Sequence, residues 1–179
     1  EIPENFRYCG FCGELIDSYR KGYPSEIEQL KDRSSRRFVA VLFADLVNFT
    51  SAAEGVDPEI IYRTIRNTLE NLARIIQNFG GCVDRYYGDG FLATFGVPEA
   101  HEDDHFRALK SAIEMQASMR ELGEKARISL NWDMQLRIGI TIGPVIRGQL
   151  DTGYLQDSSI FGHTVNLASR LQAAARPET

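Results

Sequence analysis

A short apolar segment that ends at an acidic residue constrains the fold of this chain most. Residues 38–43 read Phe-Val-Ala-Val-Leu-Phe, and Asp45 follows after a single alanine. A continuous apolar run of this length is typical of a β-strand that is covered on both faces of its sheet. The sequence therefore predicts a buried strand that begins at Arg37, with the Asp45 carboxylate at its end.

A second acidic residue has a similar setting. Asp89 lies in Gly88-Asp89-Gly90, between the short apolar segments 82–87 and 91–95. This spacing predicts a β-hairpin with the Asp89 carboxylate at its tip. Two carboxylates at strand ends suit a site for two divalent cations, which prefer anionic oxygen ligands. The alternative is that each aspartate caps the turn or helix that follows it.

Two helices are expected between and after these segments. Asp57-Pro58 predicts an N-cap and first helical position, and Gly80-Gly81 predicts the end of that helix. Its apolar residues recur at three- and four-residue steps: Ile61, Ile65, Leu69, Leu72, Ile76 and Phe79. A second helix is expected over residues 103–125, with these side chains inward: Phe106, Leu109, Ile113, Met119 and Leu122.

The C-terminal third alternates in hydrophobicity and then becomes helical. Residues 134–142 predict a strand, Gly143-Pro144 a break, and Val145-Ile146 the start of another strand. A last helix is expected to begin near Thr164. The order strand, helix, two strands, helix, strands, helix predicts an α+β sandwich, a mainly antiparallel sheet with helices on one side.

Composition narrows the functional classes. The 179 residues carry a formal net charge of −5, which argues against a broad nucleic-acid interface. No apolar run reaches the ~20 residues of a membrane span. The three cysteines do not suggest a disulfide framework, so we expect a cytoplasmic protein.

Two further motifs have alternative interpretations. Cys9 and Cys12 resemble one knuckle of a zinc ribbon within an N-terminal segment and linker over residues 1–36. A structural zinc needs four ligands, and no second pair lies nearby, so zinc is not assigned and a nucleic-acid-binding zinc ribbon is disfavoured. The string His101-Glu-Asp-Asp-His105 matches the metalloprotease pattern, but it lies at an expected helix start, where Asp103 or Asp104 would cap.

Four motifs in order carry a family resemblance. They are residues 43–50 (Phe-Ala-Asp-Leu-Val-Asn-Phe-Thr), 88–96, 137–143 (Arg-Ile-Gly-Ile-Thr-Ile-Gly) and 161–170. Together, over residues 37–176, they resemble the catalytic domain of class III nucleotidyl cyclases of the bacterial adenylyl cyclase type. The resemblance implies a ferredoxin-like or palm-type sandwich over residues 37–179. Such domains usually continue with another strand hairpin that carries a phosphate-contacting lysine, so we expect the domain to extend beyond Thr179.

The resemblance also implies a metal and phosphate site. Asp45 and Asp89, with the backbone carbonyl of Leu46, would bind two Mg²⁺ or Mn²⁺ ions in each active site. The residues implied to contact the β- and γ-phosphates are Val47, Asn48, Phe49, Thr50 and Arg137. The implied reaction converts a nucleoside triphosphate to its 3′,5′-cyclic monophosphate and pyrophosphate.

The remaining implied residues complete the site from a second chain. Asn166 and Arg170 lie four residues apart, so a helix places them on one face. In the family the asparagine orients the ribose and the arginine stabilises charge on the α-phosphate. The metal-binding half and the Asn/Arg half come from different subunits, which implies a head-to-tail homodimer.

The residues that read the base depart from the family pattern. Adenine-specific members carry Lys, and Asp or Thr, where this chain has Arg85 and Ser159. Arg85 can donate a hydrogen bond to adenine N1, and Ser159 can accept from its amino group. ATP is therefore the favoured substrate. The alternatives are GTP or a pyrimidine triphosphate, and a catalytically silent cyclase-homology module that binds nucleotide or dimerises.

Overall fold

Three segments are described by the computed structural model: residues 35–47, 56–151 and 156–179. The side chains of residues 149–151 and 156–159 are not described either. The first strand, β1 (Ser35–Val47), is followed by the helix α4 (Pro58–Asn78). The hairpin of β2 (Cys82–Tyr87) and β3 (Gly90–Phe95) comes next. The helix α5 (Asp104–Leu130), the long strand β4 (Gln135–Asp151), β5 (Gln156–Phe161) and the helix α6 (His163–Ala174) complete the order.

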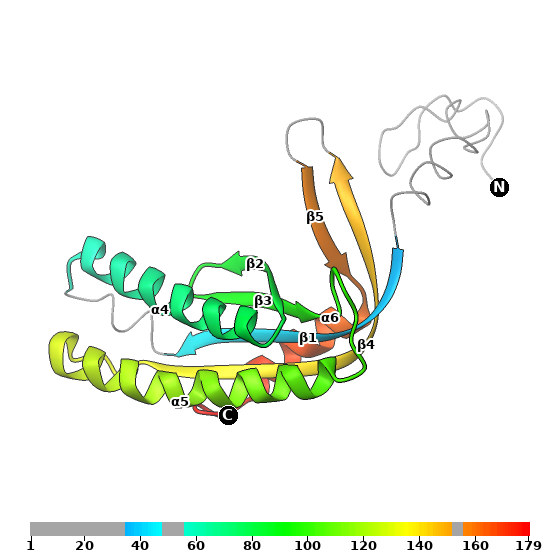
Figure 1. Ribbon diagram of the computed structural model, residues 1–179. Helices are drawn as coiled ribbons and strands as arrows, with labels where there is room; N and C mark the ends of the chain where they lie inside the picture. The colour runs from blue at the N-terminus through cyan, green and yellow to red at the C-terminus, as the bar shows by residue number, and fades with distance from the viewer. Residues whose placement is uncertain (1–34, 48–55, 152–155) are drawn as a thin grey trace, which may run out of the picture. The chain divides into compact units, whose positions relative to one another are not determined.

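The strands form one five-stranded sheet in the order β2-β3-β1-β4-β5. The pairs β1–β3, β2–β3 and β4–β5 are antiparallel. This arrangement confirms the predicted α+β sandwich with a mainly antiparallel sheet. In Figure 1 the β4–β5 hairpin rises away from the other strands, and its β4 part is the C-terminal portion of the strand, from Ile146 to Asp151.

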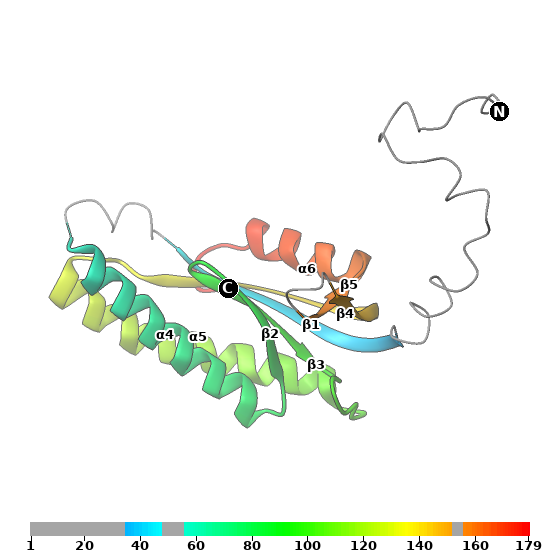
Figure 2. The ribbon, with the colours of Figure 1, turned by 90° about the horizontal axis from the view of Figure 1, so that it is seen from above.

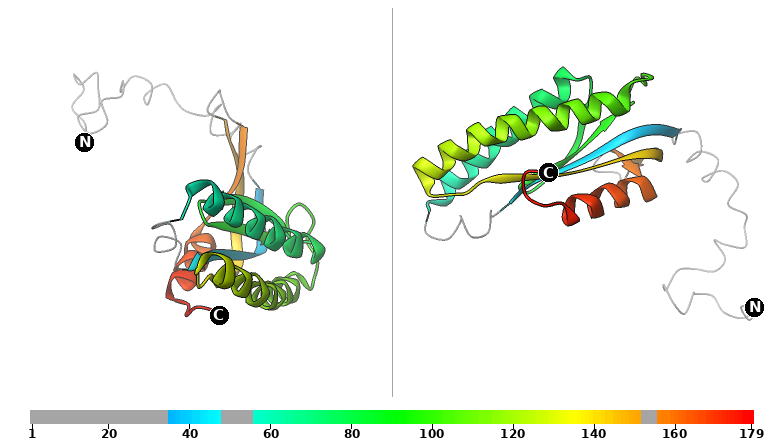
Figure 3. Two further views of the ribbon diagram at one scale, coloured as in Figure 1. Left: turned by 90° about the vertical axis from the view of Figure 1, so that its left-hand side faces the viewer. Right: turned by 90° about the horizontal axis from the view of Figure 1, so that it is seen from below.

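Helices cover both faces of the sheet, so the prediction of helices on one side is wrong. Figures 2 and 3 show α4 and α5 on one face and α6 on the other. Two apolar cores accompany this division. Alternate β1 residues Ala40, Leu42, Ala44 and Leu46 belong to the core beneath α4 and α5. Val39 and Val41 belong, with Ala168 of α6, to the second core.

The helix α4 begins as its sequence predicts. Asp57 is the N-cap, and its Oδ1 accepts a hydrogen bond from the Glu59 N–H at 2.8 Å. Pro58 takes the first helical position, where a backbone N–H would have no acceptor within the helix, so its absence costs no hydrogen bond. The predicted apolar stripe is buried at Ile61, Leu69, Leu72 and Ile76. The helix ends at Asn78, just before the predicted glycine pair.

The helix α5 follows its prediction only in part: Met119 is buried and Leu122 is partly buried against the core, as expected, but the other three residues are not. Phe106, Leu109 and Ile113 are exposed, with exposed fractions of 56%, 48% and 69%. The buried residues of this helix are Asp104, Ala108, Ser111, Met115, Met119 and Ala126. Small side chains at Ala108 and Ser111, both fully buried, allow the helix to approach the sheet closely. The free energy gained from close packing on the face of Ala108 and Ser111 outweighs the gain from burying the larger apolar side chains on the exposed face.

The predicted break at Gly143-Pro144 does not occur, because β4 continues through it to Asp151. Pairing with β5 begins beyond the proline, at Ile146 opposite Phe161. Proline therefore lies where that ladder needs no N–H donor. The Pro144 carbonyl accepts a hydrogen bond from Thr164 Oγ1 at 2.7 Å, and this bond anchors the start of α6.

Candidate active site

Strand pairing brings the two predicted carboxylates to one end of the sheet. Asp45 of β1 lies opposite Gly90 of β3, the residue that follows Asp89. The Leu46 N–H donates a hydrogen bond to the Asp89 carbonyl at 3.2 Å. Two residues that are 44 positions apart in the sequence are thus neighbours, because β1 and the β2–β3 hairpin are adjacent.

A tight turn presents Asp89, as the sequence predicts. Tyr87 pairs with Gly90, so Gly88 and Asp89 form a two-residue hairpin loop. Gly88 has φ +61°, the conformation that a glycine supplies at the first central position of such turns. The Asp89 carboxylate is therefore held close to the end of β1 by backbone geometry.

The environment of Asp45 leaves part of its negative charge uncompensated. Its Oδ2 accepts a hydrogen bond from Gln172 Nε2 at 3.2 Å and lies 3.7 Å from Arg137 Nη2. Partial burial raises the pKa of Asp45 above its ordinary value, and the negative charge of Asp89 raises this pKa further. Arg137 and Gln172 lower it, but the net shift is upward. Two neighbouring carboxylates with incomplete compensation attract cations.

These groups fit divalent cations that also bind a ligand. Carboxylate and carbonyl oxygens suit Mg²⁺, which is usually held by one or two carboxylates together with substrate phosphates. Within residues 35–47, 56–151 and 156–179 there is no cluster of three or more His, Cys, Asp or Glu side chains that could form an all-protein cage. Asp45 and Asp89 therefore match a site that is completed by a phosphate ligand.

A hollow of about 410 Å³ opens beside Asp45. It lies between the end of β1, the start of β3 and the helix α6. Its lining residues are Phe43, Ala44, Asp45, Tyr87, Gly90, Phe91, Val165, Asn166, Ser169 and Gln172. Asn166 thus borders the same hollow as Asp45 within one chain, whereas neither Asp89 nor Arg170 lines it.

Asn166 and Arg170 lie on α6 as the spacing predicts. Both are exposed, and both belong to the helix His163–Ala174. The helix is fixed on β4 by two hydrogen bonds, from Thr141 Oγ1 to the Thr164 carbonyl at 2.8 Å and from Thr164 Oγ1 to the Pro144 carbonyl at 2.7 Å. The Asn/Arg pair is therefore carried on a well-anchored element.

The predicted phosphate-binding residues are described in part. Val47 is the last residue of β1, and the Leu46 side chain is buried in the core beneath α4 and α5. Arg137 lies on β4 beside Asp45, and its buried Nε has no hydrogen-bond partner among the described residues. Asn48, Phe49 and Thr50 lie outside the described residues, as do Cys9 and Cys12.

The two predicted base-reading residues lie on strands at opposite ends of the strand order. Arg85 is half-buried on β2, next to an irregularity in the β2–β3 pairing between Val83 and Arg85. Ser159 lies on β5, where its backbone is opposite Gly148. The side chain of Ser159 lies outside the part that the structure describes.

Gln172 is a site residue that the sequence reasoning did not identify. It lies four residues after Ala168 and seven after Val165, so it continues the inner face of α6. Only 9% of its surface is exposed. A polar residue in line with Thr164 and Ala168, the other buried residues of α6, is the signal that could have identified it.

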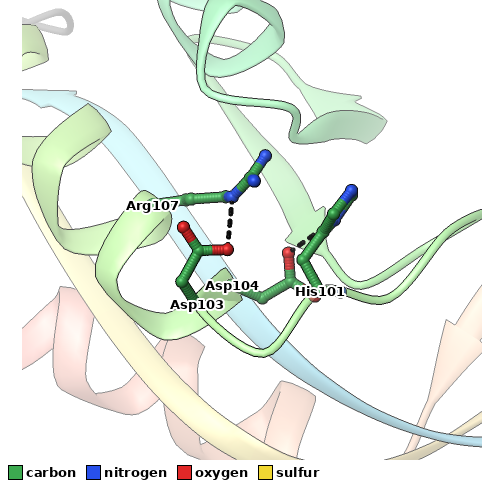
Figure 4. A network of polar contacts seen from close by, with 4 residues as sticks. All are labelled: His101, Asp103, Asp104 and Arg107. Carbon is green, nitrogen blue, oxygen red and sulfur yellow. Dashed lines mark hydrogen bonds and ion pairs between the residues drawn. The ribbon is translucent and has the colours of Figure 1, made fainter.

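The His101–His105 string has a structural role in its described contacts. Figure 4 shows Asp104 beside His101, and Asp103 beside Arg107. The buried Asp104 accepts from the His101 backbone N–H at 2.8 Å, and Asp103 Oδ1 lies 2.7 Å from Arg107 Nε. Since α5 begins at Asp104, His101 precedes the helix and cannot share a helical face with His105. The metalloprotease alternative fails for this reason.

Among the described helices, none combines the length and the apolar character that crossing a bilayer requires.

Comparisons with known proteins agree with this geometry. The family model "Adenylate and Guanylate cyclase catalytic domain" matches residues 32–179. The crystal structure of the guanylyl cyclase Cya2 is similar, with 31% identity and a TM-score of 0.75 over 80% of this chain and 73% of that one. The adenylyl cyclase CyaB from P. aeruginosa is 28% identical, with a TM-score of 0.78 over 81% and 76% of the two chains.

Curated relatives include both kinds of cyclase. An adenylate cyclase of Anabaena cylindrica is 28% identical over 158 residues, which are 86% of this chain and 30% of the relative. A membrane guanylyl cyclase of Dictyostelium discoideum is 25% identical over 92% of this chain and 10% of its own length. The chain thus spans less than a third of either relative. Because the family model covers most of the sequence and the fold agrees, this chain belongs to the class III adenylate and guanylate cyclase catalytic domain family.

Proposed function

We propose that this chain is a nucleotidyl cyclase that converts ATP to 3′,5′-cyclic AMP and pyrophosphate. The observation that carries the proposal is the register of β1 and β3, which places Asp45 beside the Asp89 turn. In the reaction the ribose 3′-oxygen forms a bond to the α-phosphorus. The bond from that phosphorus to the bridging oxygen breaks, pyrophosphate leaves, and the hydroxyl proton passes to solvent.

Asp45, Asp89 and the Leu46 carbonyl are the proposed ligands of two Mg²⁺ or Mn²⁺ ions. When bound, these ions supply positive charge at the attacking and leaving oxygens. The upward pKa shift of Asp45 that Asp89 causes supports this role, because a cation relieves the repulsion between the two carboxylates.

The remaining charges suit the triphosphate. Arg137 places a guanidinium near Asp45, where it contacts the terminal phosphates, together with the backbone of residues 47–50. Arg170 stabilises the charge that develops on the α-phosphate, and a planar, permanently charged group suits this task. Asn166 orients the ribose from the same face of α6. The protein thus contributes positioning and electrostatics without a covalent intermediate.

The proposed active form is a head-to-tail homodimer with two shared sites. Asn166 and Arg170 are exposed on α6, and the apolar side chains Leu167 and Leu171 between and beside them are also exposed. Ile146 and Phe161, at the base of the β4–β5 hairpin, have exposed fractions of 52% and 44%. Exposed apolar groups beside functional polar groups suit an interface with a second copy.

Adenine is the proposed base, with Arg85 donating to N1 and Ser159 accepting from the amino group. Although β2 and β5 stand at opposite ends of the strand order, the two strands contact each other within one chain, so one chain can supply both groups. Relatives of both the adenylate and the guanylate type match this chain, so the comparisons do not choose the base. The proposal of adenine therefore rests on the hydrogen-bonding groups of Arg85 and Ser159. The proposed compartment is the cytoplasm, since the exposed Cys82 is a free thiol that suits reducing conditions.

The function is tested by incubating the chain with each of the four ribonucleoside triphosphates and Mn²⁺. Mass spectrometry then identifies cyclic products, with an Asp89→Asn variant as the control. We expect cyclic AMP as the main product and none from the variant. Mn²⁺-dependent nucleotide binding without any cyclic product would favour the alternative of a catalytically silent regulatory module.

A further inference from the structure

Gln172 is a buried polar side chain on the inner face of α6, beside the hollow that Asp45 lines. It lies on the inner face of α6 with 9% of its surface exposed, and it bonds to Asp45, which is 127 residues distant in sequence. A buried amide that lacks a hydrogen bond is destabilising, so a buried glutamine on a helical face needs a specific partner. An ionised carboxylate can only accept hydrogen bonds, so the NH₂ group of Gln172 is the end that faces Asp45.

The backbone beneath Gln172 is held close to the sheet. Gly139 of β4 faces α6, and a Cβ atom at this position would overlap the Ala168 carbonyl oxygen and the Gln172 backbone nitrogen. Ala168 itself is fully buried. Since the helix rests directly on β4 at Gly139, the backbone of Gln172 is held close to the sheet, and its side chain reaches the Asp45 carboxylate from there.

The two oxygens of Asp45 have different surroundings. Oδ2 accepts from Gln172 at 3.2 Å and lies 3.7 Å from Arg137. Oδ1 lies 3.0 Å from the point where a Cβ atom on Gly90 would be. The hydrogen bond from α6 therefore engages Oδ2, while Oδ1 lies beside Gly90, the residue that follows Asp89.

From this geometry we propose that Gln172 is a positioning residue for the metal-binding carboxylate. Its amide holds Asp45 Oδ2 so that Oδ1 is presented to a divalent cation beside Asp89. The inference rests on the proposed function and adds a residue outside the ligand set. Groups that hydrogen-bond a metal ligand orient it, and their loss typically lowers metal affinity about 10–100-fold.

The test measures Mn²⁺ binding directly by electron paramagnetic resonance, in which the sharp signal of free Mn²⁺ is lost on binding. The full chain is titrated with Mn²⁺ in the presence of an ATP analogue that cannot cyclise. Gln172→Leu and Gln172→Met remove the hydrogen-bond donor and replace the glutamine by an apolar side chain of similar size. At least one of the two variants should therefore fold. We expect both to bind Mn²⁺ about 10-fold more weakly or worse.

Gln116→Leu is the matched control. Gln116 of α5 donates through Nε2 to the Leu136 carbonyl at 3.1 Å and to the Thr179 carbonyl at 3.3 Å. This variant therefore also loses glutamine hydrogen bonds, but they come from the opposite face of the sheet to α6 and neither is made to Asp45. We expect its Mn²⁺ affinity to equal that of the wild type. Turnover gives a second measurement: the Gln172 variants should need more Mn²⁺ for half-maximal rate, while KM for ATP at saturating Mn²⁺ stays within about twofold.

Each outcome decides the inference. Unchanged Mn²⁺ affinity in a folded Gln172 variant would overturn it while leaving the proposed cyclase intact, and so would an equal loss of affinity in Gln116→Leu. A wild-type chain that binds Mn²⁺ but makes no cyclic product would contradict the proposed turnover alone. A wild-type chain that binds no Mn²⁺ would overturn both proposals.

Discussion

Asp45 is both the acidic residue on which the proposed chemistry depends and a charge that the chain holds unfavourably without a cation. Its burial and the nearby Asp89 raise its pKa, and Arg137 and Gln172 compensate only in part. Functional sites often contain such destabilising groups, because the ligand later compensates them. Activity and stability should therefore respond in opposite directions to substitution of this residue.

Asp45→Asn and Asp89→Asn should each abolish turnover, since each removes a proposed anionic metal ligand while keeping a similar shape. The measurement is kcat with ATP and Mn²⁺, with circular dichroism to confirm the fold. A variant that keeps more than about a tenth of the wild-type kcat would have lost under ~1.4 kcal/mol of barrier lowering, too little for a metal ligand.

Asp45→Asn should also raise Tm at pH 7 in the absence of divalent cations. The pKa of Asp45 is raised in the folded chain, so its favourable contribution is complete below its ordinary value of 3.8 and is lost as pH rises through the raised pKa. The gain in Tm should therefore shrink as pH falls toward 3.8. Calorimetry at several pH values measures it, and a lower Tm for the variant at pH 7 would contradict the argument.

Arg85→Ala should raise KM for ATP and reduce the preference for ATP over GTP, whereas Arg85→Lys should be tolerated. Arg85 is the proposed donor to adenine N1, and a site built around such bonds leaves its polar groups unpaired with the wrong base. Steady-state kinetics with all four triphosphates measure this preference. Faster turnover of CTP or UTP than of ATP would show instead that Arg85 reads a pyrimidine carbonyl.

At the scale of elements, α6 is the helix that connects the two halves of the proposed chemistry. It carries Asn166 and Arg170, and it holds Asp45 through Gln172. Its position depends on hydrogen bonds at its start and on close contact with Gly139 of β4. A change beneath the helix should therefore affect both stability and activity.

Gly139→Ala should destabilise the chain by about 1–3 kcal/mol, the usual range for an atom inserted into a well-packed core. The new methyl group would overlap the backbone of α6 at Ala168 and Gln172. Urea unfolding gives the free energy, and kcat should fall as well because the helix must shift.

The control for this variant is Gly148→Ala on the same strand, since a Cβ atom at Gly148 meets nothing within 4 Å. We expect it to change the free energy of unfolding by less than about 0.5 kcal/mol. Equal destabilisation by the two variants would show that the close contact between α6 and Gly139 is not the cause.

For the whole molecule, the proposed dimer predicts complementation between inactive chains. Asp45→Asn and Arg170→Ala damage different halves of a shared site, so each should be inactive alone. Mixed in equal amounts, they form heterodimers with one intact site and one doubly damaged site. Activity should then recover to about a quarter of the wild type for random pairing and independent sites.

The complementation is measured as cyclic AMP formed after subunit exchange, and exchange is followed separately with differently tagged chains. Asp45 and Asn166 line one hollow within a single chain, so a site formed by one chain is the alternative to be tested. Such a site would show no recovery of activity in the mixture. Exchange without recovery would therefore count against the shared site.

Local patterns in the sequence determined most of the elements. The apolar run ending at Asp45, the Asp57-Pro58 start of α4 and the Gly88-Asp89 turn act through backbone preferences and neighbouring residues. Such signals are complete within a few positions, so the sequence contains them in full. The order of elements likewise predicted the α+β class, and the four motifs identified the family.

Packing between distant segments decided the rest. The buried face of α5 depended on how closely Ala108 and Ser111 could approach the sheet, and two apolar stripes on that helix left the choice open. The placement of α6 on the opposite face from α4 and α5 depended on the contact of α6 with β4 at Gly139. The bond from Gln172 to Asp45 joins residues 127 positions apart. Sequence periodicity shows that a helix has an inner face, but the partner of that face is chosen by tertiary packing, because it depends on the shapes of both surfaces.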